Sequence, residues 1–191
     1  MSNQFNRPWR NGGILLAVSA LLMGLFVLID YHRGTAQVAG AQSGVGKGNA
    51  LVLHGQLLGG GNLNTAKWKG KVIVVDFWGT WCPWCVKEAT HIAKLYAKYH
   101  HHGLEVLGVP LNDTTAAVRR YRKENPNETW PQLQDTQNSN EVIAQHLGIQ
   151  GLPTELVIDR QGVLKHVLVG YAPEQLAADV RKLLAKGAPA R

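Results

Sequence analysis

The hydrophobic positions of this 191-residue chain form one long apolar run near the N-terminus and, beyond residue 50, an alternation of short and long patterns. Residues 72–78 (VIVVDFW) and 104–109 (LEVLGV) are nearly continuous apolar runs, which predict central strands covered on both faces. Residues 86–99 place apolar side chains on one helical stripe and predict an amphipathic helix between these strands.

Shorter patterns predict the elements around this centre. Residues 51–58 predict an edge strand that the glycines at 59–61 turn back. Asp113 is expected to cap a helix that ends near residue 125. Asn138 and Glu141 have the spacing of a capping box for a helix through residue 147.

The last third of the chain predicts a hairpin followed by a helix. Residues 154–158 and 163–169 flank a turn, and Pro173 opens an amphipathic helix. Strands separated by helices, then a hairpin, then a helix predict a three-layer α/β/α sandwich with a mixed sheet.

The apolar run at residues 12–29 lacks any charged residue and follows two arginines, which predicts a transmembrane helix with the rest of the chain on the extracytoplasmic (periplasmic) side. A cleaved signal peptide, ending near the small residues 39–41, is the alternative. A Gly/Ala/Ser/Gln-rich stretch follows as a flexible linker. The predicted organisation is a basic segment at 1–11, a membrane anchor at 12–30, a linker at 31–50, a domain at 51–187 and a tail at 188–191.

The formal charge of +7 does not indicate nucleic-acid binding, because the basic residues are dispersed. Before residue 51 there are four basic side chains and one acidic one, which leaves 20 − 4 = 16 basic and 13 − 1 = 12 acidic side chains in the domain. Arg119, Arg120, Arg122 and Lys123 form a local cluster that we interpret as a solvated helix face.

The only two cysteines lie at Cys82 and Cys85, between the strand at 72–78 and the helix at 86–99. Two thiols at this spacing form and reopen a small disulfide ring, and a helix N-terminus favours the thiolate of the first one. This pattern predicts a thiol–disulfide oxidoreductase. A zinc site is the alternative, but it requires histidines or a second protomer to complete the ligand set, so no metal is predicted.

Two distant motifs resemble the thioredoxin superfamily. VVDFWGTWCPWC at residues 74–85 is similar to its active-site segment, and GLPT at 151–154 is similar to its cis-proline loop. Three further features resemble the TlpA/ResA-like branch of extracytoplasmic thiol–disulfide oxidoreductases. They are Lys69-Gly70-Lys71 ahead of the strand, an extra strand–helix segment in the middle of the domain, and the membrane anchor. The resemblance covers roughly residues 51–187. The resemblance implies a thioredoxin-like fold and no cofactor beyond a redox-active Cys82–Cys85 disulfide.

Cys82 is expected to attack substrate, because it lies at the helix start where the dipole stabilises a thiolate. Cys85, one turn further into the helix, is expected to resolve the mixed disulfide. Pro83 fixes the turn between them. Trp84 is expected to affect the acidity of Cys82 and the fit of substrate, while Trp81 shields the disulfide and offers an apolar contact.

Asp76 is a carboxylate inside an apolar strand, so burial is expected to raise its pKa. It matches the position of the buried aspartate of thioredoxins, which implies that it takes and returns the Cys85 proton. The alternative is a structural ion pair with Lys71 or Lys87. Glu88 lies one helical turn after Cys85, where the resemblance implies an influence on protonation; a plain dipole contact is the other interpretation.

The resemblance also implies that Pro153 is cis and packs against the disulfide. The Leu152 backbone would then be free to pair with an extended substrate segment, with Thr154 in the same substrate-binding loop. A proline follows the second cysteine of many relatives by five residues. Here that position is Thr90, which predicts a straighter helix and a different position for Glu88.

The resemblance implies a reductase of protein disulfides that serves cytochrome c maturation or copper-site assembly, with electrons from a membrane thiol carrier. Its partners are disulfide-containing or cysteine-rich proteins and the membrane. The opposite direction, a disulfide oxidase or isomerase of folding proteins, stays open because the chemistry is reversible. A copper-handling protein is a further alternative. A thiol peroxidase is disfavoured because Gly79 stands where such an enzyme needs a threonine.

Overall fold

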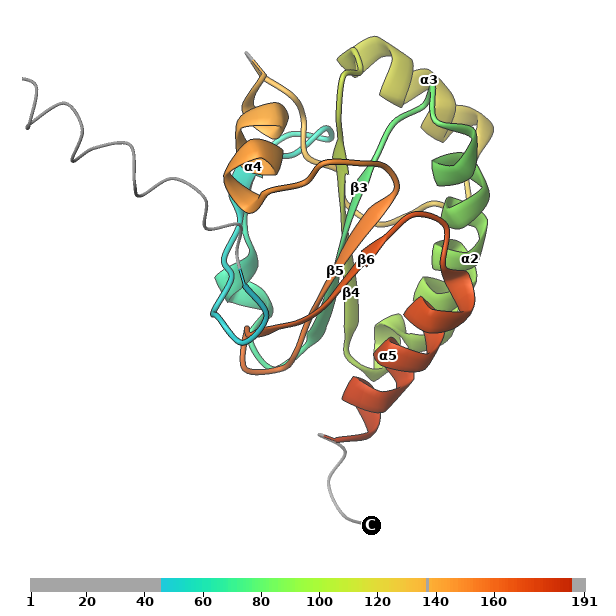
Figure 1. Cartoon of the computed structure of the whole chain (residues 1–191). Coiled ribbons are helices and arrows are strands. Elements are labelled where there is room, and N and C mark those ends of the chain that lie inside the picture. Colours follow the sequence, from blue (N-terminus) through green and yellow to red (C-terminus); the bar gives the residue numbers. More distant parts are fainter. Residues whose placement is uncertain (1–45, 137, 187–191) are drawn as a thin grey trace, which may run out of the picture. The chain divides into compact units, whose positions relative to one another are not determined.

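The computed structural model describes residues 46–136 and 138–186 (Figure 1). The predicted anchor at 12–30, most of the linker and the tail at 188–191 lie outside these residues. Within the described part of the chain, no helix has both the length and the apolar character that crossing a membrane requires.

A four-stranded mixed sheet forms the centre of the domain, in the order β4-β3-β5-β6. The two apolar runs become β3 (Val72–Trp78) and β4 (Leu104–Pro110), which pair in parallel. The predicted hairpin is β5 (Thr154–Ile158) and β6 (Leu164–Val169), and β5 runs antiparallel to β3. The mixed sheet is therefore confirmed, and every residue of β3, β4 and β5 is buried, as expected for strands covered on both faces.

Helices cover both faces of this sheet (Figure 1). On one face, α2 (Pro83–Tyr99) and α5 (Pro173–Ala185) pack their apolar stripes on Val72, Val74 and Val157. On the other face lie α4 (Ser139–Leu147) and the N-terminal segment of the domain. The remaining helix, α3 (Thr115–Glu124), packs its one buried residue near the first turn of α2.

The predicted edge strand at 51–58 is wrong in its extent, but the chain does turn back at the glycines 59–61 as predicted. Only β1 (His54–Gln56) is a strand, and it pairs with β2 (Asn62–Asn64) in a separate two-stranded sheet. The residues just before β1 form no strand, because their amides bind outside any strand ladder. The Leu51 amide donates to a loop carbonyl, and the Leu53 amide donates to a threonine hydroxyl. Short 3₁₀ turns complete the described elements at Thr65–Trp68 and His100–His102.

The predicted cap of α3 is wrong, whereas the predicted cap of α4 is right in position but lacks the hydrogen bonds of a capping box. Thr114, not Asp113, caps α3, and its hydroxyl accepts a hydrogen bond from the Ala117 amide at 3.1 Å. Asn138 stands before α4 in a left-handed conformation (φ 60°) without a side-chain cap. The carboxylate of Glu141 instead accepts the Asn112 amide, 29 residues away, at 2.6 Å. Asp113 and Glu141 therefore hydrogen-bond to neighbouring loops and do not cap their own helices.

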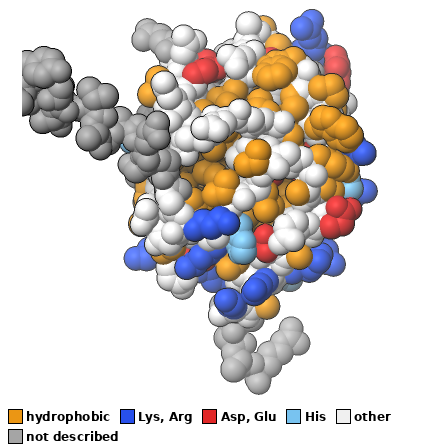
Figure 2. Space-filling model, viewed as in Figure 1, with side chains coloured by type: hydrophobic (Ala, Val, Ile, Leu, Met, Phe, Trp, Pro, Cys, Tyr) orange, Lys and Arg blue, Asp and Glu red, His pale blue; other side chains and the backbone are white. Residues whose placement is uncertain are grey.

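The basic cluster on α3 is mostly a solvated face, as interpreted, because Arg119, Arg120 and Lys123 are exposed and only Arg122 is half-buried. Arg119 donates to the Leu58 carbonyl at 3.1 Å, and Arg122 donates to the Trp130 carbonyl at 2.7 Å. In the face of the domain drawn in Figure 2, Lys and Arg side chains gather toward the C-terminal end of α5, and hydrophobic side chains gather over the middle of that face.

Candidate active site

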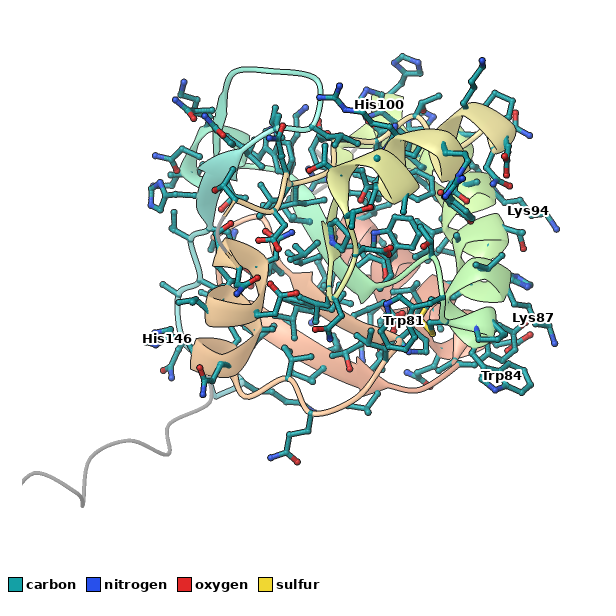
Figure 3. The ribbon with its side chains drawn as sticks, turned by 90° about the horizontal axis from the view of Figure 1, so that it is seen from above. Trp81, Trp84, Lys87, Lys94, His100 and His146 are labelled. Atoms are coloured by element: carbon teal, nitrogen blue, oxygen red, sulfur yellow. A yellow bond between two sulfur atoms is a disulfide. The ribbon has the colours of Figure 1, made fainter. Side chains whose placement is uncertain are left out.

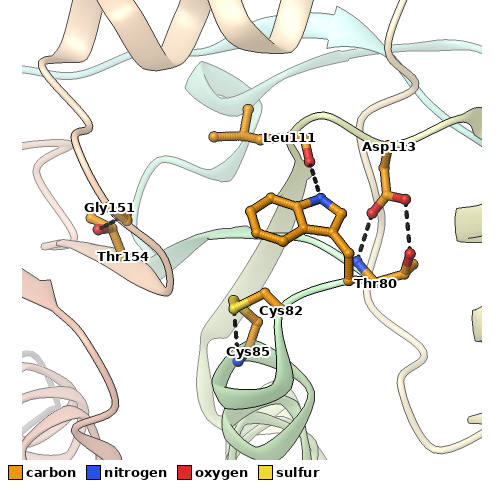
Figure 4. Close-up of a disulfide and its surroundings, with 8 residues drawn as sticks. Thr80, Cys82, Cys85, Leu111, Asp113, Gly151 and Thr154 are labelled. Atoms are coloured by element: carbon orange, nitrogen blue, oxygen red, sulfur yellow. Dashed lines mark hydrogen bonds between the residues drawn. A yellow bond between two sulfur atoms is a disulfide. The ribbon is translucent and has the colours of Figure 1, made fainter.

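The two cysteines lie where β3 passes into α2 and form a disulfide with an S–S distance of 2.07 Å and a Cα–Cα distance of 5.3 Å (Figure 4). Cys82 is the N-cap of α2, and its sulfur accepts a hydrogen bond from the Cys85 amide at 3.2 Å. Pro83 occupies the first turn, where a missing N–H costs nothing. The helix therefore begins with the free N–H group of Cys85 directed at the first sulfur.

The two sulfur-bearing residues differ in exposure. Cys82 is 6% exposed and Cys85 is 2% exposed. Both pack against Trp78 and Val118, and the partly buried Leu152 covers the same cluster. Cys82 is thus the more accessible of the two residues.

Side-chain hydrogen bonds hold the turn before Cys82. The carboxylate of Asp113 accepts the Thr80 amide at 2.6 Å and the Thr80 hydroxyl at 2.8 Å (Figure 4). The Trp81 indole donates to the Leu111 carbonyl at 3.1 Å. A Cβ at Gly79 would lie 2.7 Å from the indole nitrogen of Trp81, so this turn has no room for the threonine that a thiol peroxidase needs there.

Two tryptophans beside the disulfide are exposed, Trp81 by 55% and Trp84 by 56%. Trp84 lies on the outer side of α2 next to Lys87, whereas Trp81 lies closer to the interior (Figure 3). The Trp84 ring lies 5.4 Å from the Tyr171 ring, and the Lys87 ammonium lies over both rings. A rim of aromatic and cationic groups therefore borders the redox site.

The Leu152–Pro153 peptide bond is cis. The Thr154 hydroxyl donates to the Gly151 carbonyl at 2.7 Å, and the Pro153 carbonyl accepts the Gly170 amide at 2.8 Å. Leu152 packs against the cluster around the disulfide, and within the described residues its backbone forms no hydrogen bond to other backbone groups. The loop thus presents one backbone position without an internal partner beside the cysteines.

Asp76 lies on β3, is almost fully buried, and has no ion-pair partner among the described residues. The suggested partners are engaged elsewhere, because Lys71 pairs with Glu105 and Lys87 lies over aromatic rings. Burial raises the pKa of Asp76 well above its usual value, and the negative charges of Glu128 and Glu88 raise it further.

Glu88 is completely buried, although a glutamate on an amphipathic helix is usually exposed. One carboxylate oxygen accepts the Ala172 amide at 3.1 Å, just before α5, and the other has no partner among the described residues. Burial raises the pKa of Glu88 to about 6, which the Ala172 amide opposes and the charge of Glu174 supports. α2 is one continuous helix through Thr90, and the Glu88 side chain on it is buried.

A third buried carboxylate, Glu155 on β5, was missed by the sequence analysis. It is directly opposite Asp76 in the β3–β5 register and is completely buried. Burial raises the pKa of Glu155 to about 9, with smaller contributions from the charges of Asp76 and Glu88. The signal was present, because TELVI is an apolar strand interrupted by an acid, the same pattern that marked Asp76.

A fourth acid lies beside α3. Glu128 accepts the Tyr121 hydroxyl at 2.7 Å, and burial raises the pKa of this carboxyl. Tyr121 also packs against Trp78, with ring centroids 5.0 Å apart. Among the described residues, no group of three or more histidine, cysteine or acidic side chains has an arrangement that could hold a metal ion.

A reversible disulfide at a helix start, next to a cis-proline loop on a mixed α/β sheet, defines a thiol–disulfide oxidoreductase of the thioredoxin-like class. Comparison with known proteins agrees with this class. The chain matches the Redoxin family over residues 46–185 and belongs to that family, within its TlpA/ResA-like thioredoxin branch.

Individual relatives carry the same activity in their names. The chain is 29% identical to the thiol-disulfide oxidoreductase ResA of Halalkalibacterium halodurans, over 93% of this chain and 95% of the relative. It is 32% identical to the thiol:disulfide interchange protein DsbE of Pseudomonas aeruginosa, over 64% and 67% of the two chains. This protein is therefore a protein thiol–disulfide oxidoreductase.

Solved structures agree on the fold. A thiol:disulfide interchange protein of the thioredoxin family from Chlorobium tepidum superimposes with a TM-score of 0.64 at 26% identity, covering 74% of this chain and 99% of that one. The thioredoxin domain of a thiol-disulfide oxidoreductase from Bacteroides vulgatus reaches a TM-score of 0.66 at 23% identity, covering 73% and 99%, which shows the shared fold.

Proposed function

We propose that this oxidoreductase is a membrane-anchored, extracytoplasmic reductase of protein disulfides. The observation that carries the direction is the pair of buried carboxyl groups on Asp76 of β3 and on Glu88, one turn after Cys85 in α2. Negative charge near a cysteine disfavours its thiolate, and a reduced form that is poorly stabilised makes a stronger reductant.

The reaction begins with Cys82. Its thiolate, stabilised by the start of α2, attacks one sulfur of a substrate disulfide, whose S–S bond breaks. The released substrate thiolate takes a proton from water, and a mixed disulfide joins Cys82 to the substrate.

Cys85 completes the reaction. Its thiol gives its proton to the Asp76 carboxylate, and its sulfur attacks the Cys82 sulfur. The bond to the substrate breaks and the second substrate thiolate leaves. Two electrons have then passed from the dithiol to the substrate, and the Cys82–Cys85 disulfide has formed. Glu88 adjusts the proton affinity of this site through its charge.

Substrate recognition is assigned to the surface around Cys82. The Leu152 backbone pairs with an extended substrate segment, as a strand adds to a sheet edge, with Pro153 and Thr154 shaping that loop. Trp81 and Trp84 supply exposed apolar area on the other side of the cysteines.

The apolar segment at residues 12–30 supplies the membrane anchor in this proposal, and a membrane-embedded thiol carrier supplies the electrons. Cysteine-rich proteins such as apocytochrome c, or proteins that assemble copper sites, are the proposed substrates. The support is the apolar sequence, the preceding arginines and the family resemblance.

The reductase proposal is tested with two cysteine variants of the full chain in an insulin-disulfide reduction assay. Cys82→Ser removes the nucleophile and is expected to abolish activity. Cys85→Ser is expected to accumulate a covalent complex with substrate, visible on a non-reducing gel and cleared by dithiothreitol. Reduction that persists in the Cys82 variant contradicts the assignment of the nucleophile.

A disulfide oxidase of folding proteins is the second candidate function. The hydrogen bond from the Cys85 amide to the Cys82 sulfur favours it, because the same donor stabilises a thiolate in the reduced state. The first turn of α2 also contains no acidic side chain. The reduction potential separates the two directions.

A further inference from the structure

We propose that Glu155 is a positioning residue of the redox reaction, which shares a proton with Asp76 behind the disulfide and so keeps Asp76 able to accept the proton of Cys85. This inference rests on the role proposed for Asp76. It adds a second carboxyl group, from a strand distant in sequence, to the proton chemistry of the site.

The two carboxyl groups belong to one cross-strand pair. Asp76 on β3 is in register with Glu155 on β5, and the strands are antiparallel. Side chains directly opposite in such a pair have Cβ atoms about 4.5–5.5 Å apart, on the same face of the sheet. The next pair along, Val74 with Val157, packs under α2 and α5, so both acids face that layer too.

Neither carboxyl group meets a compensating charge. Both oxygens of Glu155 lack a hydrogen-bond partner in any other described residue, and Glu155 is 0% exposed. Among the described residues, no Lys or Arg forms an ion pair with Asp76, Glu88 or Glu155. An ionised carboxylate without water, a donor or a cation is very costly, and a bound proton removes that cost.

Other titratable groups lie on the elements packed against this face of the sheet. The charges that act on it come from Glu88 on α2 and Glu128 after α3. Tyr121 on α3 also interacts with Asp76 through its charge. The same elements carry further ionisable groups, which are Lys87 and His91 on α2, Tyr171 and Glu174 at the start of α5, and the His166–Asp179 pair of β6 and α5.

Two facing carboxyl groups in such a layer titrate as a pair in two separate steps. The first proton leaves at the lower pH and the second is retained to higher pH. Glu155 is the stronger candidate to retain it, because Glu155 is 0% exposed and both of its oxygens are buried without a hydrogen-bond partner, whereas Asp76 keeps an exposed fraction of 3%. At neutral pH the pair then holds one proton and one negative charge, with the charge on Asp76.

This division suits the resolving step. The structure shows no hydrogen bond between the two carboxyl groups, and we expect one to form when Asp76 is ionised, with the protonated Glu155 donating to the facing Asp76 carboxylate. This bond would stabilise the ionised form of Asp76 and keep it a base. When Cys85 attacks, its S–H bond breaks, the proton moves to Asp76, and the electron pair of Cys85 forms the S–S bond with Cys82. The pair then carries two protons, and one of them returns to solvent or to Cys85 when the disulfide is reduced again.

The test measures the resolving step alone in the full chain. The reduced protein is mixed with the aromatic disulfide 5,5′-dithiobis(2-nitrobenzoate), and stopped-flow absorbance follows the second nitrothiobenzoate released, which reports attack by Cys85. The rate is recorded from about pH 5 to pH 10 for wild type, Glu155→Gln, Glu155→Leu and Asp76→Asn. Exposed Glu124→Gln is the matched control.

Glu155→Gln keeps a donor but cannot titrate, so we expect a rate near wild type at neutral pH and loss of the inflection near pH 9. Glu155→Leu loses the donor, so we expect the rate at neutral pH to fall about tenfold or more. Circular dichroism checks that this variant folds, and the glutamine variant decides the question if it does not.

The outcomes separate this inference from the proposed function. An alkaline inflection that survives in Glu155→Gln, or a leucine variant as fast as the glutamine variant, overturns the shared-proton pair. If Asp76→Asn slows the resolving step while both Glu155 variants match wild type, only the pair is wrong. If Asp76→Asn itself resolves at the wild-type rate, the base assignment and the pair are both wrong.

Discussion

Replacing Glu88 by glutamine tests the electrostatic description of the site through folding stability. Glutamine has the same shape, and its carbonyl oxygen can still accept the Ala172 amide, but it cannot ionise. The change therefore removes one buried negative charge with little loss of packing or hydrogen bonding.

The magnitude follows from linkage. The pKa of Glu88 rises from 4.5 to about 6, mainly because of burial. A raised pKa in the folded state gives stability that is complete below the unfolded value and is lost as the pH rises through the folded value. A shift of about 1.5 units is worth ~2 kcal/mol, so ionised Glu88 should reduce the free energy of unfolding by that amount above about pH 7.

The assay is urea unfolding of the oxidised protein at about pH 4.5 and pH 7.5, followed by circular dichroism with attention to a constant m-value. Wild type and Glu88→Gln should have similar stability at the acidic pH, and the variant should be more stable by ~2 kcal/mol at the higher pH. Exposed Glu124→Gln should not show this gain in stability at the higher pH. A stability difference that does not change with pH would refute the buried-charge reasoning.

Two further substitutions test the framework of the site. Asp113→Ala removes both hydrogen bonds to Thr80. We therefore expect the free energy of unfolding to fall by ~1–3 kcal/mol and proteolysis at the turn to be faster. An unchanged urea midpoint would show that these bonds contribute nothing to stability. Gly108→Ala places a Cβ 1.8 Å from the Gln132 side-chain oxygen, whereas Gly59→Ala meets no atom within 4 Å. We expect Gly108→Ala to lower the free energy of unfolding by ~1–3 kcal/mol relative to Gly59→Ala, and its melting temperature to fall accordingly. Equal melting temperatures for the two variants would contradict the tight packing of Gln132 against Gly108.

The sheet was predictable because long-range packing and local pattern agree there. The apolar run at 72–78 has the bounds of β3, and the hairpin and last helix follow from equally clear patterns. The capping roles predicted for Asp113 and Glu141 failed because these side chains bind partners more than 25 residues away, which no local spacing reveals.

The acidic layer was only partly predictable. Asp76 stands out inside an apolar strand, and the same rule applied to residues 154–158 would have found Glu155. That the two acids face each other depends on the antiparallel pairing of strands about 80 positions apart. The complete burial of Glu88 depends on the Ala172 amide, 84 residues away.

The central claim is that the buried acids make this protein a reductant, and the reduction potential of the Cys82–Cys85 pair tests it most directly. The full chain is equilibrated in glutathione or dithiothreitol buffers, and the reduced fraction is measured by thiol alkylation. A potential near −250 mV or lower, about that of thioredoxin, is the predicted result. A potential of about −120 to −180 mV, in the range of oxidases and isomerases, would contradict the proposed direction.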